Sequence, residues 1–310
     1  MARLKEYNGH YCESEYEYAF IGFLEVEGWK YSSGNNISRV TKRDVLIADD
    51  FKKFIADTNP DLTEDEVIQI YDNVRLVGAE SDFATLHKVY GWMVNGVQFT
   101  PQDGLPRMIP LIDFDNWDKN IFRVVNQFTV EYTNNGQKEN RRPDVLLFVN
   151  GMPLCVVELK NPADANATIY DAWKQINIRY WRDIPHLLHY CPLACISDGV
   201  KTRLGTVRTP YEHFYAWRRV NERDVVSTLP FAETETMIKG VYTPERFVEI
   251  FRDYIYFQDS IYDSDEVEIV CRYPQFFAAK LLKQSIVNSV VTRSGKGGTY
   301  FGATGCGKTY

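Results

Sequence analysis

Among its 310 residues the sequence has no long unbroken apolar run, no low-complexity stretch and no internal repeat. A helix needs about 20 consecutive apolar residues to cross a membrane, so no membrane span is expected. The opening residues lack the charged and apolar regions of a secretory signal peptide. We therefore expect a cytoplasmic protein that makes no membrane contact.

Metal-binding patterns of cysteine and histidine are also missing. The six cysteines contain no CxxC pair, and the five histidines show no ligand spacing. Cys191 and Cys195 are four residues apart, but no second ligand pair accompanies them. We expect free, buried thiols and no zinc site.

The net charge of −7 argues against a dedicated nucleic-acid coat protein, which is usually basic. It does not exclude a DNA enzyme, because acidic residues can gather metal ions while local basic surfaces contact phosphates. Each basic cluster taken alone is best interpreted as a solvated face. The clusters are Lys138–Arg142, Lys174–Arg182, Lys201–Arg208 and Arg218–Arg223.

Apolar periodicity predicts helices in the first hundred residues and strands after them. Tyr16, Phe20, Ile21 and Leu24 form one helical stripe, and Thr63 with Glu66 forms a capping box. The expected helices are 13–27, 42–57, 63–76, 81–92, 166–182, 243–256 and 274–291. The expected strands are 108–113, 122–132, 144–149, 154–160, 194–197 and 299–301.

This order of elements predicts a mixed α/β fold, with a mixed β-sheet flanked by helices. A polar stretch, a helix and an acidic loop follow one another near residues 225–262 and indicate a boundary. We divide the chain at this point into residues 1–240 and residues 241–310.

Three charged residues interrupt two otherwise apolar strands, and they are the main candidates for a catalytic site. Asp144 opens the first strand, and Glu158 and Lys160 lie two residues apart on one face of the second. A buried charge is costly unless it is paired or binds a metal. Two carboxylates, a main-chain carbonyl and waters suit Mg²⁺, with Asp144 and Glu158 as ligands. In an arbitrary sequence, the same short motif is more often an ordinary ion pair at strand ends.

The geometry of the hairpin is a test of this site. A plain two-residue turn at Asn150-Gly151 would pair Asp144 with Val157, on the face away from Glu158. The three groups converge only if the hairpin contains an odd-length loop or a bulge, and Pro153 is a plausible place for it.

A second motif lies at the end of the sequence. Residues 302–309 satisfy the phosphate-binding pattern GxxxxGK[ST] and follow the short strand Tyr300-Phe301. In such a loop the glycines let backbone amides surround the phosphates, the lysine reaches the β and γ phosphates, and the hydroxyl binds Mg²⁺. The expected nucleotide-binding residues are Gly302, Thr304, Gly305, Gly307, Lys308 and Thr309. No second acidic motif for hydrolysis follows, so we do not expect this polypeptide to hydrolyse ATP alone.

Together these motifs resemble the restriction (R) subunit of type I restriction–modification enzymes, over most of the chain. The resemblance implies a PD-(D/E)xK nuclease core followed by the beginning of a RecA-like, helicase-like motor. Asp144 and Glu158 would be metal ligands and Lys160 the catalytic lysine. The acidic residue of the opening helix would be Glu17, with Glu15 as the alternative, although on an amphipathic helix such a residue often lies on a solvated face.

The resemblance also implies roles for three further residues. Gln175 and Tyr180 match a Gln…Tyr motif beside the nuclease centre. The family's separation is four residues and here it is five, which on an α-helix turns the second side chain by about 100°. Gln275, in Arg272-Tyr273-Pro274-Gln275, resembles the residue that contacts adenine in helicase-type motors.

Three functional hypotheses follow. The first is an Mg²⁺-dependent endonuclease that cuts double-stranded DNA after ATP-driven translocation, working with separate methyltransferase (M) and specificity (S) subunits. The second is an assembly and regulatory module of the motor subunit that cuts little itself. The third is a helicase-linked repair nuclease.

Overall fold

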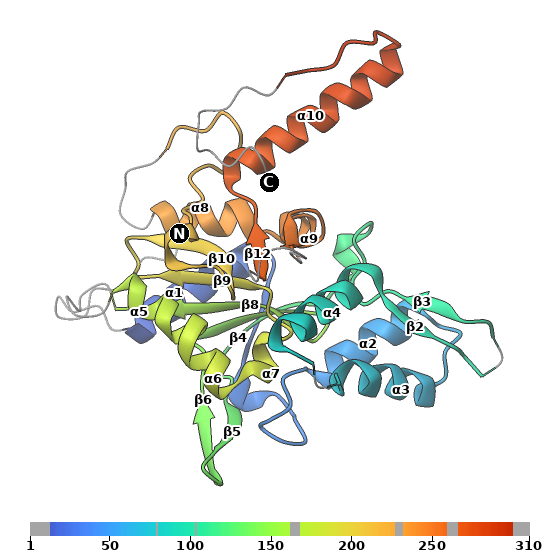
Figure 1. The fold of residues 1–310 in the computed structure, drawn as a ribbon, viewed down its shortest axis with the longest axis vertical. Coiled ribbons are helices and arrows are strands. Elements are labelled where there is room, and N and C mark those ends of the chain that lie inside the picture. Colours follow the sequence, from blue (N-terminus) through green and yellow to red (C-terminus); the bar gives the residue numbers. More distant parts are fainter. Residues whose placement is uncertain are drawn as a thin grey trace.

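The computed structural model describes residues 13–78, 80–102, 104–161, 168–226, 232–258 and 266–299. Its centre is a six-stranded mixed sheet in the order β1-β4-β7-β8-β9-β10, with helices on both faces (Figure 1). This confirms the expected mixed α/β architecture. The strands are β1 (Lys30–Ser33), β4 (Phe122–Asn126), β7 (Val145–Val149), β8 (Met152–Leu159), β9 (Leu193–Ser197) and β10 (Thr202–Thr206).

The middle of the sheet is covered on both faces, which explains its continuous apolar strands. Every residue of β7, β8 and β9 is buried. β8 pairs antiparallel with β7 and parallel with β9, so β8 and β9 end at the same edge of the sheet. Residues that follow β8, and those that precede β7, are therefore brought together at that edge.

One face of the sheet is covered by α1 (Glu13–Val26), α8 (Ala232–Val241) and α9 (Pro244–Asp253). The predicted stripe of α1 is buried, and its Tyr16 hydroxyl lies 2.6 Å from Ser197 Oγ and 3.1 Å from Thr234 Oγ1. The Tyr242 hydroxyl lies 3.7 Å from Cys155 Sγ on the same face. Segments from both ends of the described chain therefore share one core.

The opposite face carries α5 (Ile169–Lys174), a π-helix at Gln175–Tyr180 and α6 (Trp181–Asp183). A separate helical group lies to one side of the sheet in Figure 1. It consists of α2 (Ala48–Thr58), α3 (Glu64–Arg75) and α4 (Asp82–Asn95), with the small sheet of β2 (Val97–Phe99) and β3 (Arg107–Ile109).

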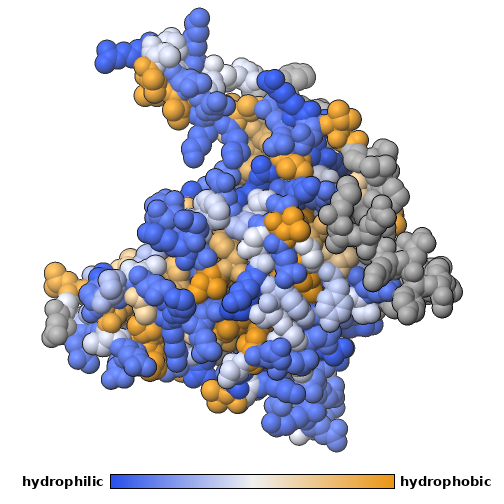
Figure 2. Space-filling view, turned by 180° about the vertical axis from the view of Figure 1, so that it is seen from behind, coloured by the Kyte–Doolittle hydropathy of each residue, from blue (hydrophilic) through white to orange (hydrophobic). Residues whose placement is uncertain are grey.

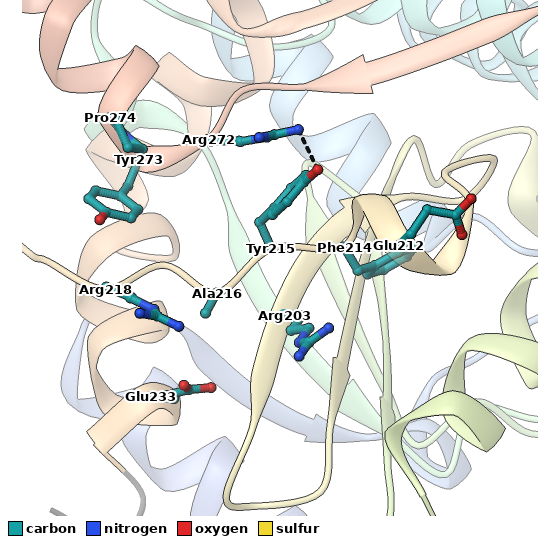
Figure 3. A pocket seen from close by; sticks show the side chains of 10 residues that line it. All are labelled: Arg203, Glu212, Phe214, Tyr215, Ala216, Arg218, Glu233, Arg272, Tyr273 and Pro274. Carbon is teal, nitrogen blue, oxygen red and sulfur yellow. Dashed lines mark hydrogen bonds between the residues drawn. The ribbon is translucent and has the colours of Figure 1, made fainter. Parts of the chain in front are cut away.

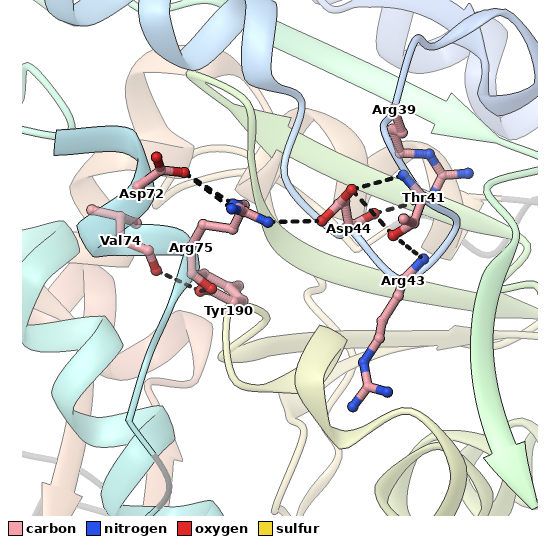
Figure 4. A network of polar contacts seen from close by, with 8 residues as sticks. All are labelled: Arg39, Thr41, Arg43, Asp44, Asp72, Val74, Arg75 and Tyr190. Atoms are coloured by element: carbon pink, nitrogen blue, oxygen red, sulfur yellow. Dashed lines mark hydrogen bonds and ion pairs between the residues drawn. The ribbon is translucent and has the colours of Figure 1, made fainter. Parts of the chain in front are cut away.

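Polar contacts tie this helical group to the rest of the molecule (Figure 4). Arg75 on α3 lies 3.1 Å from Asp72 and 3.4 Å from Asp44, which anchors the loop before α2. The Tyr190 hydroxyl donates to the Val74 carbonyl over 2.6 Å. These contacts hold α3 against the segment that leads into β9.

The other elements surround the sheet, and none of the helices in the described residues is both long and apolar enough to cross a membrane. The 20-residue helix α10 projects from the body (Figure 1), and apolar groups are scattered over the mostly polar surface of the molecule (Figure 2). Ile286 and Val290 are exposed apolar residues of α10. The remaining helices and strands of the described chain are β5 (Val130–Asn134), β6 (Gln137–Arg141), α7 (Pro185–Leu188), β11 (Ile255–Gln258), β12 (Val267–Val270), α10 (Tyr273–Thr292) and the 3₁₀ turns Gly34–Asn36, Trp117–Lys119 and Tyr211–His213.

Several element boundaries differ from those expected, for local reasons. The helix expected from 42 begins at Ala48, because the Asp44 carboxylate accepts a hydrogen bond from Thr41 N–H and holds a turn there. The strand expected over 122–132 is two strands, since Gln127 has a φ of +55° and breaks the ladder. The capped helix is confirmed as α3, with both hydrogen bonds of the Thr63–Glu66 capping box. The strand expected over 299–301 lies outside the described residues, except for Thr299.

The cysteines that the structure describes are free thiols, as expected. Cys155, Cys191 and Cys195 are buried and Cys271 is partly buried, and burial raises the pKa of each. Cys12 and Cys306 lie outside the described residues.

Gly151 offers a test of the turn that precedes β8. Its φ is +76°, and a Cβ there would collide with the Ile47 carbonyl. We expect Gly151→Ala to lower the free energy of unfolding by more than about 2 kcal/mol, since strain and a backbone clash add. Gly136 has a φ of +79° but open space around it, so Gly136→Ala should cost about 1 kcal/mol. If urea unfolding showed equal losses of unfolding free energy for Gly151→Ala and Gly136→Ala, the predicted clash would be contradicted.

Candidate active site

The β7–β8 hairpin contains the predicted irregularity. Val149 pairs with Met152 and Phe148 with Pro153 across the Asn150-Gly151 turn, but Leu147 pairs with Cys155. Leu154 is therefore an extra residue in β8, a β-bulge directly after Pro153. From the bulge onward Val145 pairs with Val157, and the same register places Asp144 opposite Glu158. The geometric condition for a shared site is met.

Main-chain contacts fix both ends of this site. The Leu159 N–H donates to Asp144 Oδ2 over 2.7 Å, which holds the carboxylate against the end of β8. The Lys160 N–H donates to the Ser197 carbonyl over 2.8 Å, which extends the pairing of β8 with β9. The Lys160 ammonium lies 3.8 Å from Glu158 Oε2, and its side chain is 15% exposed. The lysine ammonium thus lies beside the buried Glu158 carboxyl group and is itself partly exposed.

Glu158 is a fully buried carboxyl group with one oxygen unsatisfied. Oε1 accepts a hydrogen bond from the Tyr180 hydroxyl, while Oε2 accepts none within the described part of the chain. Burial, and then the charge of Asp144, raise the pKa of Glu158 well above its ordinary value, and Lys160 opposes this only in part. A cation at Oε2 would remove the cost of the ionised form.

The donor set therefore fits a hard divalent cation. Asp144 and Glu158 offer carboxylate oxygens at one edge of the sheet, and no group of three or more His, Cys, Asp or Glu suited to a metal occurs among the described residues. Mg²⁺ commonly binds through one or two carboxylates and keeps several waters, whereas structural zinc needs four nitrogen or sulfur ligands.

The five-residue separation of Gln175 and Tyr180 is explained by the π-helix. In this helix residues five apart lie over one another, as residues four apart do on an α-helix. Gln175 Nε2 consequently donates to the Tyr180 hydroxyl over 3.1 Å, and that hydroxyl donates to Glu158. Burial raises the pKa of Tyr180 well above its ordinary value, so the phenol keeps its proton. The expected divergence of the two side chains does not occur.

Glu17 lies at the same end of the sheet as Asp144, but its side chain contacts Asn126. It is 7% exposed, and Asn126 Nδ2 donates to its Oε1 over 2.6 Å. Asn126 pairs with Val145, the residue after Asp144, so its side chain lies on the face opposite to Glu158. A catalytic role for Glu17 stays a prediction. The sequence analysis missed Asn126, which is fully buried at the end of β4. A polar residue at the end of an apolar strand is the signal that selected Asp144, and it could also have found Asn126.

The nucleotide-binding residues are only partly described. Gln275 lies in the first turn of α10, where its Oε1 accepts a hydrogen bond from the Arg272 N–H over 2.7 Å. Gly302, Thr304, Gly305, Gly307, Lys308 and Thr309 lie outside the described residues. Their roles remain predictions.

Comparison with known families gives a single clear assignment. A family model described as the N terminus of the type I restriction enzyme R protein matches residues 11–213, which is more than half of the chain. The chain belongs to this R protein family. The match covers the bulged hairpin, the π-helix and all strands of the central sheet.

Curated relatives of the R protein family agree. A Methanocaldococcus jannaschii protein named as the type I restriction enzyme MjaIXP endonuclease subunit is 30% identical over 300 residues, which is 89% of this chain and 28% of the relative. The Haemophilus influenzae type I restriction enzyme HindI endonuclease subunit is 27% identical over 96% of this chain and 29% of its own length. The chain thus spans less than a third of these relatives.

The buried carboxyl predicts a pH-dependent stability. Because the folded state binds the Glu158 proton more tightly than the unfolded state, this group stabilises the fold below its unfolded pKa of about 4.3. That stability is lost as pH rises through the higher folded pKa. Without divalent metal at neutral pH, we expect Glu158→Gln to raise the free energy of unfolding by on the order of 1 kcal/mol.

The comparison needs a matched control and a second pH. The exposed Glu212 should give no such gain as Glu212→Gln. At pH 4 and below, the advantage of Glu158→Gln should shrink, because wild-type Glu158 is then protonated in both states. An advantage that stays constant from pH 4 to pH 8 in denaturant unfolding would refute the burial argument.

Proposed function

We propose that this chain carries the nuclease centre of a type I restriction R subunit and hydrolyses phosphodiesters of double-stranded DNA with Mg²⁺. The observation that supports this most directly is the bulge at Leu154, which sets Asp144 opposite Glu158, whose Oε2 lies 3.8 Å from the Lys160 ammonium. A regular hairpin would have pointed the two carboxylates to opposite faces.

The roles of the residues follow from their contacts. Asp144 and Glu158 would hold the metal, which would polarise the phosphodiester and lower the pKa of the attacking water. Leu159 N–H fixes Asp144, and Tyr180, itself held by Gln175, fixes Glu158 through Oε1 and leaves Oε2 for the cation. Lys160, which lies beside Glu158 and is partly exposed, would orient the water and offset charge that develops on the phosphate.

The motor belongs to the proposal for the whole subunit. Gln275 and the 302–309 loop would bind ATP at the start of a RecA-like, helicase-like translocase, and the nuclease part would end near residue 240. The packing of Tyr242 and Phe247 in the same core as the sheet favours a boundary somewhat later than that. In the intact enzyme, M and S subunits would supply methylation and sequence recognition. The names of the relatives, all endonuclease subunits, favour cutting over a purely regulatory role.

Substitution in the full-length subunit, assembled with its M and S partners, tests the nuclease centre. We expect Lys160→Ala and Glu158→Ala to lower the rate of plasmid cleavage by about a hundredfold or more, because each removes a group that acts on the scissile phosphate. ATP hydrolysis should continue at the wild-type rate. The control is Lys201→Ala, an exposed lysine on the turn before β10. Cleavage that survives in both variants would instead favour the assembly and regulatory role.

Metal binding can be measured without cleavage. In 10 mM MgCl₂ or MnCl₂ we expect the Tm of the wild-type chain to rise, because a ligand that binds only the folded state stabilises it. The rise in Tm should be lost in Asp144→Asn and in Glu158→Gln. It should be kept in Glu17→Gln, because the Glu17 carboxylate is bound by Asn126 on the other face of the sheet. An equal rise in all four proteins would place the metal elsewhere.

A further inference from the structure

A closed ring of four buried hydroxyl groups lies at the edge of the sheet where β8 and β9 end. The Tyr16 hydroxyl lies 2.6 Å from Ser197 Oγ and 3.1 Å from Thr234 Oγ1. Thr202 Oγ1 completes the ring, 2.6 Å from Ser197 Oγ and 2.7 Å from Thr234 Oγ1. The four residues come from α1, β9, β10 and α8, and all are buried. This hydroxyl ring therefore joins two helices to two strands of the central sheet.

Ser197 is the member of the ring with the most partners. Its hydroxyl also donates to the Lys201 carbonyl over 3.0 Å and accepts from the Gly199 N–H over 3.2 Å, in the turn that leads to β10. Burial raises the pKa of Tyr16 to about 12, so its phenol keeps its proton at neutral pH. Neutral hydrogen bonds from α1, β10 and the turn thus converge on one side chain.

Burial of apolar surface alone does not explain the ring. Desolvation of a hydroxyl is costly, and a buried hydrogen bond can be exchanged for apolar groups of the same shape with little loss of stability. Elsewhere on α1 the core is filled by apolar residues such as Phe20 and Leu24. A closed polar network adds a fixed geometry, because each hydroxyl must meet its partners at a set distance and direction.

The element that the ring fixes is the end of the β8–β9 ladder. Ser197 is the last residue of β9, and its carbonyl accepts the Lys160 N–H over 2.8 Å. Hydrogen bonds at the ends of ladders open most easily. Ser197 pairs with Leu159, so its side chain lies on the face of the sheet opposite to Glu158. The ring thus holds, from one face, the carbonyl that fixes a lysine beside the carboxyl group of the other face.

The neighbouring strand is fixed at the same level. Thr202 stands directly opposite Ser197 in the antiparallel pairing of β9 with β10. Its N–H donates to Glu233 Oε2 over 3.0 Å, and Figure 3 shows the Glu233 side chain directed from the first turn of α8 towards β10. Both the side chain and the main chain of Thr202 are therefore held by α8.

We propose that the hydroxyl ring positions Lys160 for the proposed nuclease reaction, by fixing the Ser197 carbonyl to which the Lys160 N–H is bound. The inference rests on the proposed function in taking Lys160 as the catalytic lysine. Tyr16, Thr202 and Thr234 are then positioning residues that act through Ser197. Partners that hold a functional group in place commonly affect activity by about 10- to 100-fold, because small misplacements slow a reaction strongly.

Hydrogen exchange at the Lys160 amide measures the anchor without DNA. In Thr234→Val a methyl group of similar size replaces the hydroxyl, and we expect the Lys160 amide of the full chain, labelled with ¹⁵N-lysine, to exchange about tenfold faster. Thr234→Ser keeps the hydroxyl and should restore the wild-type rate. The matched control is Thr206→Val at the other end of β10, which removes a buried hydroxyl 2.8 Å from Thr209 Oγ1. It should leave Lys160 exchange within about twofold of wild type.

Plasmid cleavage by the full-length subunit, assembled with its M and S partners, measures the consequence. We expect Thr234→Val and Tyr16→Phe to lower the cleavage rate by about tenfold or more, with ATP hydrolysis unchanged. Thr234→Ser and Thr206→Val should cleave at close to the wild-type rate. The rise in Tm with Mg²⁺ should persist in Thr234→Val, because the Glu158 carboxyl lies on the other face of the sheet.

The outcomes distinguish this inference from the nuclease assignment. Wild-type exchange at Lys160 in Thr234→Val would show that the ring does not anchor the lysine, and the inference would be wrong. It would also be wrong if exchange rose without slower cleavage, or if Thr206→Val slowed cleavage as much as Thr234→Val. Cleavage that survives in Lys160→Ala would instead overturn the nuclease assignment, even where exchange shows that the ring holds Lys160.

Discussion

The extra residue in β8 is the constraint on which the rest of the site depends. Side chains alternate between the faces of a strand, so the insertion of Leu154 moves every later residue of β8 by one position relative to β7. Asp144 then stands opposite Glu158. Pro153, which cannot donate to the ladder, occupies the point at which the register changes. The hydrogen bond from Leu159 N–H to Asp144 depends on the same shift.

A second irregularity supports the first from above the sheet. The π-helix at Gln175–Tyr180 inserts one residue into the helix over β8, and it turns Tyr180 onto Glu158 while Gln175 stays in contact with its hydroxyl. Glu158 Oε1 is thereby held by the Tyr180 hydroxyl, while Oε2 accepts no hydrogen bond from the residues that the structure describes. Both irregularities carry a local energetic cost, and both serve the same carboxylate. Bulges and π-turns often occur at functional sites for this reason.

The sheet also links the Asp144–Glu158 site with the part of the chain that follows β10. β10 lies beside β9 on one side, and on the other it receives the 212–218 segment and contacts β12 through Thr206 Oγ1 and the Glu268 carbonyl. The first turn of α10 lies at the same edge, where Arg272 donates a hydrogen bond to the Tyr215 hydroxyl.

The sequence by itself determined the candidate site residues and most of the elements. Asp144, Glu158 and Lys160 were recognisable because charge within buried strands is costly, and the apolar stripe of α1 and the capping box of α3 follow from local rules. It also determined that a regular hairpin could not bring the carboxylates together. Only the tertiary structure decided where the bulge falls and that the five-residue separation of Gln175 and Tyr180 spans one turn of π-helix. It also decided that Glu17 contacts Asn126 and not Glu158. These outcomes depend on packing between segments more than a hundred residues apart or on competition between nearly equal backbone hydrogen-bond patterns, and local sequence encodes neither.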